Sequence, residues 1–87
     1  MLDLLRGNRL DLLPAGGERA FFLAGQALVN GDLIEVRGQG KWIPARFFWS
    51  GKVERWPRVA AEDPRASTAD LAVLRRFNPE SLCRHPD

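Results

Sequence analysis

Residues that bind metals or form covalent cross-links are almost absent from this chain. Cys83 is the only cysteine and His85 the only histidine. No internal disulfide can form, and a zinc site would lack the three or four Cys, His or carboxylate ligands that it normally has. The serines and threonines have only His85 as a candidate base, and it lies in a predicted C-terminal tail, residues 80–87. We therefore expect a protein that is not an enzyme, with no metal, no cofactor and no catalytic residues.

Long apolar runs and an excess of charge of one sign are lacking as well. No stretch reaches the roughly 18 consecutive apolar residues of a membrane-spanning helix. Charged residues interrupt the first segment, where a signal peptide would have its apolar core. The 13 Lys and Arg residues outnumber the 11 Asp and Glu residues by only two, a net charge of +2. These absences predict a cytoplasmic protein with no membrane partner, and they exclude a strong field of one sign around the whole molecule.

What the chain does contain is enough apolar sequence for one small folded body. Of its 87 residues 45% are apolar and 28% are charged, which is near the average of globular proteins. A chain of this length has room for one core but not for two. We divide it into a small β-barrel domain, residues 1–59, and residues 60–87, which hold a linker, a short helix and a tail packed on that domain.

Turn residues recur about every ten positions and separate short runs of alternating polar and apolar residues, a pattern typical of an antiparallel β fold. Gly7-Asn8 would close a hairpin between the first two strands, with a helical first turn as the alternative. Asn30-Gly31-Asp32 and Gly38-Gln39-Gly40-Lys41 are further turns. Strands are predicted at residues 2–6, 9–13, 19–23, 33–37, 42–49 and 53–59. The fold class is mainly β, a small antiparallel barrel of five or six strands with one C-terminal helix.

The alternation in the central strands predicts which side chains face the core. Ile34 and Val36 should point inward. In residues 42–49, one face carries Ile43, Ala45, Phe47 and Trp49, and the opposite face carries Trp42, Pro44, Arg46 and Phe48. Pro44 lacks an N–H group, so it predicts an edge position or a bulge.

The segment from residue 60 onward has a different character. Residues 60–66 are typical of a linker, and Ser67-Thr68-Ala69-Asp70 matches a capping box that opens a helix running from Thr68 to Phe77. Asn78-Pro79 ends that helix, and residues 80–87 are expected to fray. Leu71, Leu74 and Phe77 recur near helical spacing, so this stripe packs either on the barrel or on a second copy of the chain in a homo-oligomer.

One set of motifs resembles a known family. Phe21-Phe22-Leu23-Ala24-Gly25, then Gly31-Asp32-Leu33-Ile34-Glu35-Val36, then Gly40-Lys41-Trp42-Ile43-Pro44-Ala45-Arg46 resemble a family of small bacterial domains of unknown function. The resemblance covers residues 8–59 and departs from the family pattern after Phe48. It implies an SH3-like barrel and a place on a phage, plasmid or conjugative element. It implies no catalytic residues.

The best functional candidate is a group of aromatic and arginine side chains in the middle of the chain. Residues 37–58 carry six basic side chains against Glu54 alone, a local charge of +5. Aromatic rings stack on unpaired bases and arginines neutralise phosphates, so we expect single-stranded or structured nucleic acid to bind there. The candidate binding residues are Trp42, Arg46, Phe48, Arg55, Trp56 and Arg58.

Two alternatives to nucleic-acid binding stay open for this group. The rings could close the ends of the core while the arginines form a solvated face. The same composition is typical of a protein-binding hot spot, as in an adaptor or a phage-type inhibitor of a host protein complex.

Two other sequence patterns have structural rather than functional explanations. Residues 38–41 lack the length and the following helix of a phosphate loop, and Asp32 and Glu35 should fall on opposite faces of their strand.

Overall fold

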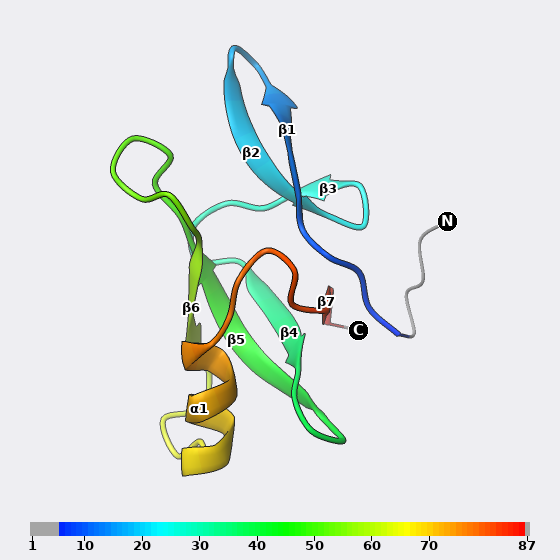
Figure 1. The fold of residues 1–87 in the computed structure, drawn as a ribbon, viewed down its shortest axis with the longest axis vertical. Helices are drawn as coiled ribbons and strands as arrows, with labels where there is room; N and C mark the ends of the chain where they lie inside the picture. Colours follow the sequence, from blue (N-terminus) through cyan, green and yellow to red (C-terminus); the bar gives the residue numbers. More distant parts are fainter. Residues whose placement is uncertain (1–5, 87) are drawn as a thin grey trace.

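The computed structural model describes residues 6–86 and contains, within them, seven strands and one helix (Figure 1). The elements are β1 (Asp11–Ala15), β2 (Glu18–Leu23), β3 (Gln26–Ala27), β4 (Leu33–Arg37), β5 (Trp42–Phe48), β6 (Arg58–Ala61), α1 (Thr68–Arg75) and β7 (Cys83–Arg84). The strands form two antiparallel sheets, one in the order β1-β2-β3 and one in the order β6-β5-β4-β7. The predicted fold class, a small antiparallel β fold with one helix near the C-terminus, is confirmed.

The β4–β5 hairpin agrees closely with the alternation in the sequence. Val36 pairs with Ile43 and Ile34 with Ala45 across the ladder, and all four side chains are buried together with Phe47. The even-numbered residues of β5 lie on the opposite, outer face of the sheet, because successive side chains of a strand point to opposite sides. The predicted assignment of residues 42–48 to two faces is therefore confirmed.

Pro44 lies in a strand that is central in its sheet, but β6 pairs with this strand only from Ala45 onward, so Pro44 occupies an edge position on that side, as expected. It pairs with Glu35 of β4, and its carbonyl accepts a hydrogen bond from the Glu62 backbone N–H at 3.1 Å. The carbonyl and the nitrogen of one strand residue point to the same side. The side of Pro44 that lacks an N–H therefore faces the end of β6, which stops at Ala61. The hydrogen bonds between β5 and β6 involve later residues of β5, so none of them is lost.

Two tight turns build the N-terminal sheet. Gly16 and Gly17 connect β1 to β2 with φ values of 59° and 87°, which is the left-handed backbone that a two-residue hairpin turn requires. The strand predicted at residues 19–23 is confirmed as β2. The strand predicted at residues 2–6 lies almost wholly outside the described residues. Asn8, in the predicted turn after it, forms an antiparallel backbone bridge with Cys83.

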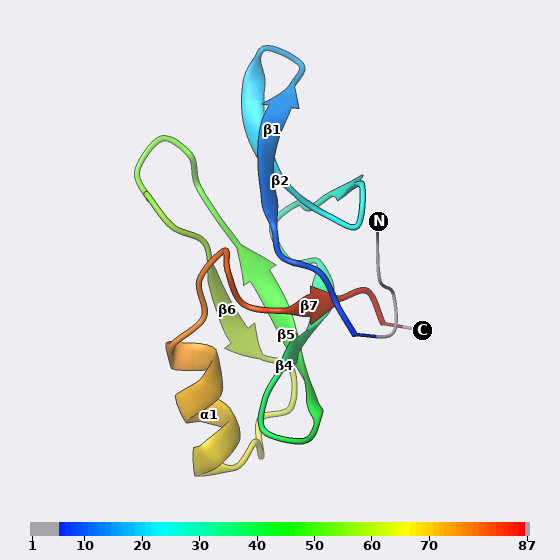
Figure 2. The same cartoon turned by 45° about the vertical axis from the view of Figure 1, so that its right-hand side comes forward.

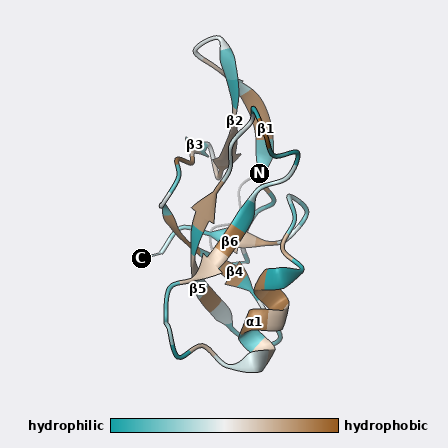
Figure 3. Ribbon diagram, turned by 90° about the vertical axis from the view of Figure 1, so that its left-hand side faces the viewer, coloured by the Kyte–Doolittle hydropathy of each residue, from teal (hydrophilic) through white to brown (hydrophobic). Residues whose placement is uncertain are grey.

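The core lies between the two sheets and the helix. The Phe21 ring of β2 meets Phe47 at 6.4 Å and Trp49 at 4.6 Å between ring centroids, both edge to face. Apolar stretches run through β5 and onto α1 (brown in Figure 3). Ser67 caps the helix as predicted, because its hydroxyl accepts from the Asp70 N–H at 3.1 Å.

Two predictions for the second half of the chain were wrong. No strand covers residues 53–59: Val53 and Glu54 donate their N–H groups to the Ser50 carbonyl, so residues 50–54 form a turn. The strand begins after Pro57 and continues as β6 to Ala61, into the predicted linker and across the expected boundary at residue 59.

The tail, residues 80–87, is not frayed where the structure describes it. Cys83 and Arg84 form β7 against Val36 and Glu35 of β4, and on the other side Cys83 pairs with Asn8. Its position in the core explains the difference, because Cys83 is completely buried. A polar tail with one small apolar residue gave no periodic signal for this strand.

The helix directs its apolar stripe into its own chain. Leu74 is 5% exposed and belongs to the core, and Phe77 packs against it. Leu71 is 42% exposed. Of the three residues considered for a contact between copies, only Leu71 is available without opening the fold.

The effect on stability of truncating a side chain of the helix stripe should therefore depend on how deeply that side chain is buried. We expect Leu74→Ala to lower the free energy of unfolding by about 2–5 kcal/mol, because it leaves a cavity in the core. Leu71→Ala, the matched control, should change it by less than about 0.5 kcal/mol. Urea unfolding followed by tryptophan fluorescence measures both. Equal effects, together with a melting temperature that rises with protein concentration, would mean that the stripe pairs between chains.

The Cys83 thiol should be inert in the folded protein. Burial raises the pKa of this thiol to about 12, and the thiolate is the species that reacts with disulfide reagents. We expect no labelling by a chromogenic disulfide at about pH 8, and complete labelling once denaturant is added. Rapid labelling of the native protein would show that β7 opens readily.

Candidate functional site

The six predicted binding residues do not form one continuous patch. Trp42 and Phe48 occupy the two ends of β5 on the outer face of the sheet. They are six residue steps apart along an extended strand, a distance of about 20 Å. Arg46 lies between them, Arg58 lies on β6, and Arg55 and Trp56 lie on the loop that joins β5 to β6. The structure thus brings four of the six together at one end and leaves Trp42 at the other.

The Phe48 end carries the most accessible rings. Arg58 is the register partner of Phe48, and its guanidinium carbon lies 5.0 Å from the Phe48 ring centroid. Arg55 stacks in the same way on Trp56, at 5.2 Å, and Trp56 is 56% exposed. Pro57 is buried between Trp56 and Arg58, so both neighbours point outward. Cation–π contacts of this kind hold the rings and the charges together.

The Trp42 end is more enclosed. Two guanidinium carbons approach the half-buried Trp42 ring, Arg84 at 4.4 Å and Arg37 at 5.3 Å from its centroid. Gly7 packs so closely on this ring that a Cβ atom there would lie 2.5 Å from Trp42 Cη2. An incoming ligand would find Trp42 already covered by protein atoms on part of its surface.

Arg46 is committed to an ion pair within the protein. Its Nε and one terminal nitrogen donate to the two carboxylate oxygens of Glu62 at 2.6 and 2.8 Å, and its other terminal nitrogen donates to the Gly31 carbonyl at 3.1 Å. These hydrogen bonds lower the pKa of the Glu62 carboxyl group and raise the pKa of Arg46. Bidentate pairing of this kind leaves little of the guanidinium for a phosphate.

The count of charges in the basic window left out two of the acids on this face, Glu35 and Glu62. Glu35 receives a hydrogen bond from Arg84 Nε at 2.7 Å, and Glu54 lies 3.5 Å from Arg58 Nε. Glu35 and Glu62 lie just outside the basic window of residues 37–58, so no count within that window could find them. Arg84 also lies outside the window and was missed for the same reason. Arg37 was counted in the window but was not placed beside Trp42, because only strand pairing brings Arg37 and Arg84 together at that ring.

The third tryptophan belongs to the interior. Trp49 is half-buried and packs on the core, and its indole N–H donates to the Glu54 carbonyl at 3.0 Å. The alternative that the rings close the core therefore applies to Trp49, while Trp56 faces water. The prediction that Asp32 and Glu35 lie apart agrees with their contacts, since Asp32 accepts from the Val29 N–H at 2.8 Å.

The remaining chemistry of the described residues is limited. Within residues 6–86, no group of three His, Cys, Asp or Glu side chains could hold a metal ion. Over the same residues, none of the helical structure is both long enough and apolar enough to cross a membrane. The one imidazole, His85, places Nε2 at 2.7 Å from the Leu23 carbonyl oxygen, which orients the end of the chain against β2.

Comparison of the chain with protein-family models, with curated proteins and with solved structures finds no match. The resemblance to the family of small bacterial domains therefore stays a prediction, and the functional argument depends on the geometry alone.

The Arg46–Glu62 pair predicts how stability depends on pH. Because the folded protein lowers the pKa of Glu62 below its ordinary value of 4.5, the pair stabilises the fold above that pH, and this contribution disappears as the pH falls through the lowered pKa. We expect wild type to melt at a higher temperature than Glu62→Gln at about pH 7, and the difference to shrink by about pH 3.

The matched control is Glu80→Gln, which breaks the Arg9–Glu80 pair, whose side chains are 68% and 75% exposed. It should change the melting temperature less than Glu62→Gln does at neutral pH. A difference between wild type and Glu62→Gln that is the same at both pH values would show that Glu62 acts through packing alone.

Proposed function

We propose that this protein is a non-enzymatic accessory module that binds single-stranded nucleic acid. The contact surface is the group at the Phe48 end of the sheet, formed by Phe48, Arg55, Trp56 and Arg58, which we call the aromatic–arginine end. The observation that carries the proposal is the exposed Trp56 ring with a guanidinium stacked on it, beside a second arginine–ring pair. The family resemblance adds the expectation that the module serves a phage, plasmid or conjugative element.

The chemistry of this end fits unpaired bases. An exposed aromatic face stacks a base with about 1–3 kcal/mol, without reading its sequence. A guanidinium that stacks on a ring keeps its N–H groups at the ring's edge, where they can reach the phosphates on either side of the stacked base. A base held inside a duplex offers no free face to Trp56, so single strands should bind better than duplexes.

The Trp42 end would act as a weaker second contact. It lies about 20 Å along β5, a span that a strand of several nucleotides can cover, and Arg37 has no ion pair among the described residues. The Arg46–Glu62 pair between the two ends places a carboxylate on the path, which limits the number of phosphates held there. We therefore expect moderate affinity from few phosphate contacts.

A protein partner is the second candidate function. The observation that favours it is the mixture of charge on the outer face, where Arg46 pairs with Glu62 and Arg84 with Glu35. Tryptophan and arginine are both enriched in protein-binding hot spots. An adaptor, or an inhibitor of a host protein complex, would use the same face without a strong dependence on salt.

The nucleic-acid proposal predicts a defined response to mutation. A fluorescent single strand of about 12 nucleotides, titrated by anisotropy, should bind wild type. Trp56→Ala should weaken binding by about ten-fold or more through the lost stack. The double variant Arg55→Glu/Arg58→Glu should weaken it further and flatten the salt dependence, since each phosphate contact contributes about −0.7 to the slope of log K against log salt for single strands.

Arg65→Glu provides the matched control for each single reversal, Arg55→Glu and Arg58→Glu, because it makes the same charge change on the loop between β6 and α1, at the other end of the molecule from the β5–β6 loop (Figures 1 and 2). It should leave affinity nearly unchanged. No binding at low salt would overturn the proposal. Equal losses from Arg65→Glu and from Arg55→Glu or Arg58→Glu alone would show a non-specific attraction of charge rather than a site.

A further inference from the structure

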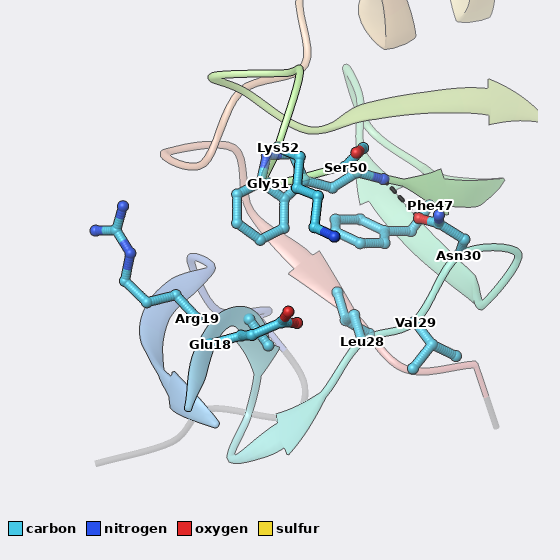
Figure 4. Close-up of a pocket in the computed structure, with 11 residues that line it drawn as sticks. Glu18, Arg19, Leu28, Val29, Asn30, Phe47, Ser50, Gly51 and Lys52 are labelled. Carbon is cyan, nitrogen blue, oxygen red and sulfur yellow. Dashed lines mark hydrogen bonds between the residues drawn. The ribbon is translucent and has the colours of Figure 1, made fainter. Parts of the chain in front are cut away.

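A cleft of about 470 Å³ opens between the N-terminal hairpin and the loop that follows β5. The hairpin β1–β2 and this loop project from the same end of the molecule (Figure 2). Leu28 and Phe47 lie on the apolar floor of the cleft, and Glu18 and Lys52 reach in beside it (Figure 4). Trp49 and Arg19 also line the cleft, and the Arg19 side chain extends away from it. This volume lies within the range of sites that hold ligands, and the cleft is separate from the aromatic–arginine end.

One wall of the cleft is an open edge of a β-sheet. Ala15 pairs with Glu18 across the two-residue turn, so the backbone groups of Glu18 and Ala20 face β1 and those of Arg19 and Phe21 face the other way. On that other side, β3 pairs only with Phe22 and Leu23, and Leu28 donates its N–H to the Phe21 carbonyl at 2.8 Å. The chain then turns away toward β4.

The Arg19 backbone is therefore left at the cleft without a ladder partner among residues 6–86. Its N–H and its carbonyl point to the position where the next strand of the sheet would lie. An open edge of this kind is a template for one more strand, and an extended peptide is the ligand whose donors and acceptors repeat at the right spacing.

Two opposite charges mark the walls of the cleft. Glu18 reaches in from β2 and Lys52 from the loop after β5 (Figure 4). Within residues 6–86 neither side chain forms an ion pair. A ligand that brings one cation and one anion, with an apolar group between them, would complement both walls and the floor.

We infer that the cleft binds an extended peptide segment of a partner protein, which adds as a short strand to the Arg19 edge of β2. The segment places an apolar side chain on the floor, with a basic residue beside Glu18 and an acidic residue beside Lys52. This site is independent of the proposed nucleic-acid function, because it uses none of the residues of the aromatic–arginine end.

The contacts favour a peptide over a nucleic acid in this cleft. Phe47 is only 1% exposed, and the Trp49 ring is contacted by Phe21 and lies close to Gly51, so the cleft offers no fully free ring face for a base to stack on. Glu18 places a negative charge opposite Lys52, so the cleft has no continuous positive surface for a run of phosphates. A polynucleotide also has no regular amide donors to match the backbone carbonyl of Arg19, whereas a peptide strand supplies an N–H and a carbonyl at every second residue.

The test selects ligands for the whole 87-residue chain from a library of random seven-residue peptides displayed on phage. Synthetic copies of the selected peptides are then titrated by fluorescence anisotropy. Their backbone nitrogens are methylated one at a time, which removes one N–H without changing the protein. Methylation at the residue opposite Arg19 should weaken binding about ten-fold or more, and methylation of its two neighbours should matter much less.

A matched pair of protein variants tests the same edge. Arg19→Pro removes the open N–H, and Arg19→Ala keeps it. Proline should be tolerated here, because Pro14 lies directly opposite in β1 with its own nitrogen turned away from the partner strand. We expect Arg19→Pro to lose about ten-fold or more in affinity relative to Arg19→Ala at an unchanged melting temperature. Glu18→Lys should shift the selected sequences from a basic to an acidic residue at one position.

The outcomes separate this site from the proposed function. Selection of no peptide above background would overturn the inference. So would binding that no methylation weakens, because that result would exclude strand addition even if Arg19→Pro failed to fold. A selected peptide that is displaced by the single-stranded oligonucleotide and lost with Trp56→Ala would place the contact at the aromatic–arginine end instead. Oligonucleotide binding that survives Arg19→Pro confirms that the two sites are distinct.

Discussion

The edge-to-face contact of Phe21 with Phe47 and Trp49 joins the two sheets of this small fold. Phe21 comes from β2, and its partners come from the end of β5 and the residue just beyond it. Burying such rings dominates the stability of a short chain, which has little other apolar surface to remove from water. This contact sets where the N-terminal hairpin stands relative to the larger sheet, and with it the cleft between β2 and the loop after β5.

The sequence predicts what depends on local periodicity. Apolar residues alternate with their neighbours in the two central strands, at Ile34, Val36, Ile43 and Ala45. In a strand with one buried face, this period of two determines which side chains face the core. The Ser67 cap could also be predicted from the sequence, because a capping box is a contact between residues only three positions apart. The division of β5 into an inner face and an outer face, which places Arg46 and Phe48 outside, follows from the same rule.

The sequence could not predict what depends on contacts between distant residues. β7 was missed because Cys83 and Arg84 acquire a strand conformation only through pairing with Val36 and Glu35, which are far away in the chain. The strand expected at residues 53–59 has apolar residues at suitable positions. The Ser50 carbonyl, however, accepts hydrogen bonds from the N–H groups of Val53 and Glu54, so these groups are not available to a sheet. A turn that closes with local hydrogen bonds competes successfully with a strand in which Pro57 supplies no donor.

The same limit explains why the basic window overstated the charge of the candidate site. Of its six cations, Lys41, Arg46 and Arg58 each meet a carboxylate, in Asp70, Glu62 and Glu54, and two of these acids come from outside the window. Arg37, Lys52 and Arg55 have no such partner in the part of the chain that the structure describes.

Lys52 and Arg55 both lie on the loop after β5, where Trp56 faces water and Lys52 faces the cleft. The ion pairs thus neutralise charge in the middle of the sheet, while Lys52 and Arg55 keep theirs on one loop, whose two sides carry different chemistry. A linear count of charges measures what a segment contains, whereas the register of the strands decides what it can offer to a ligand.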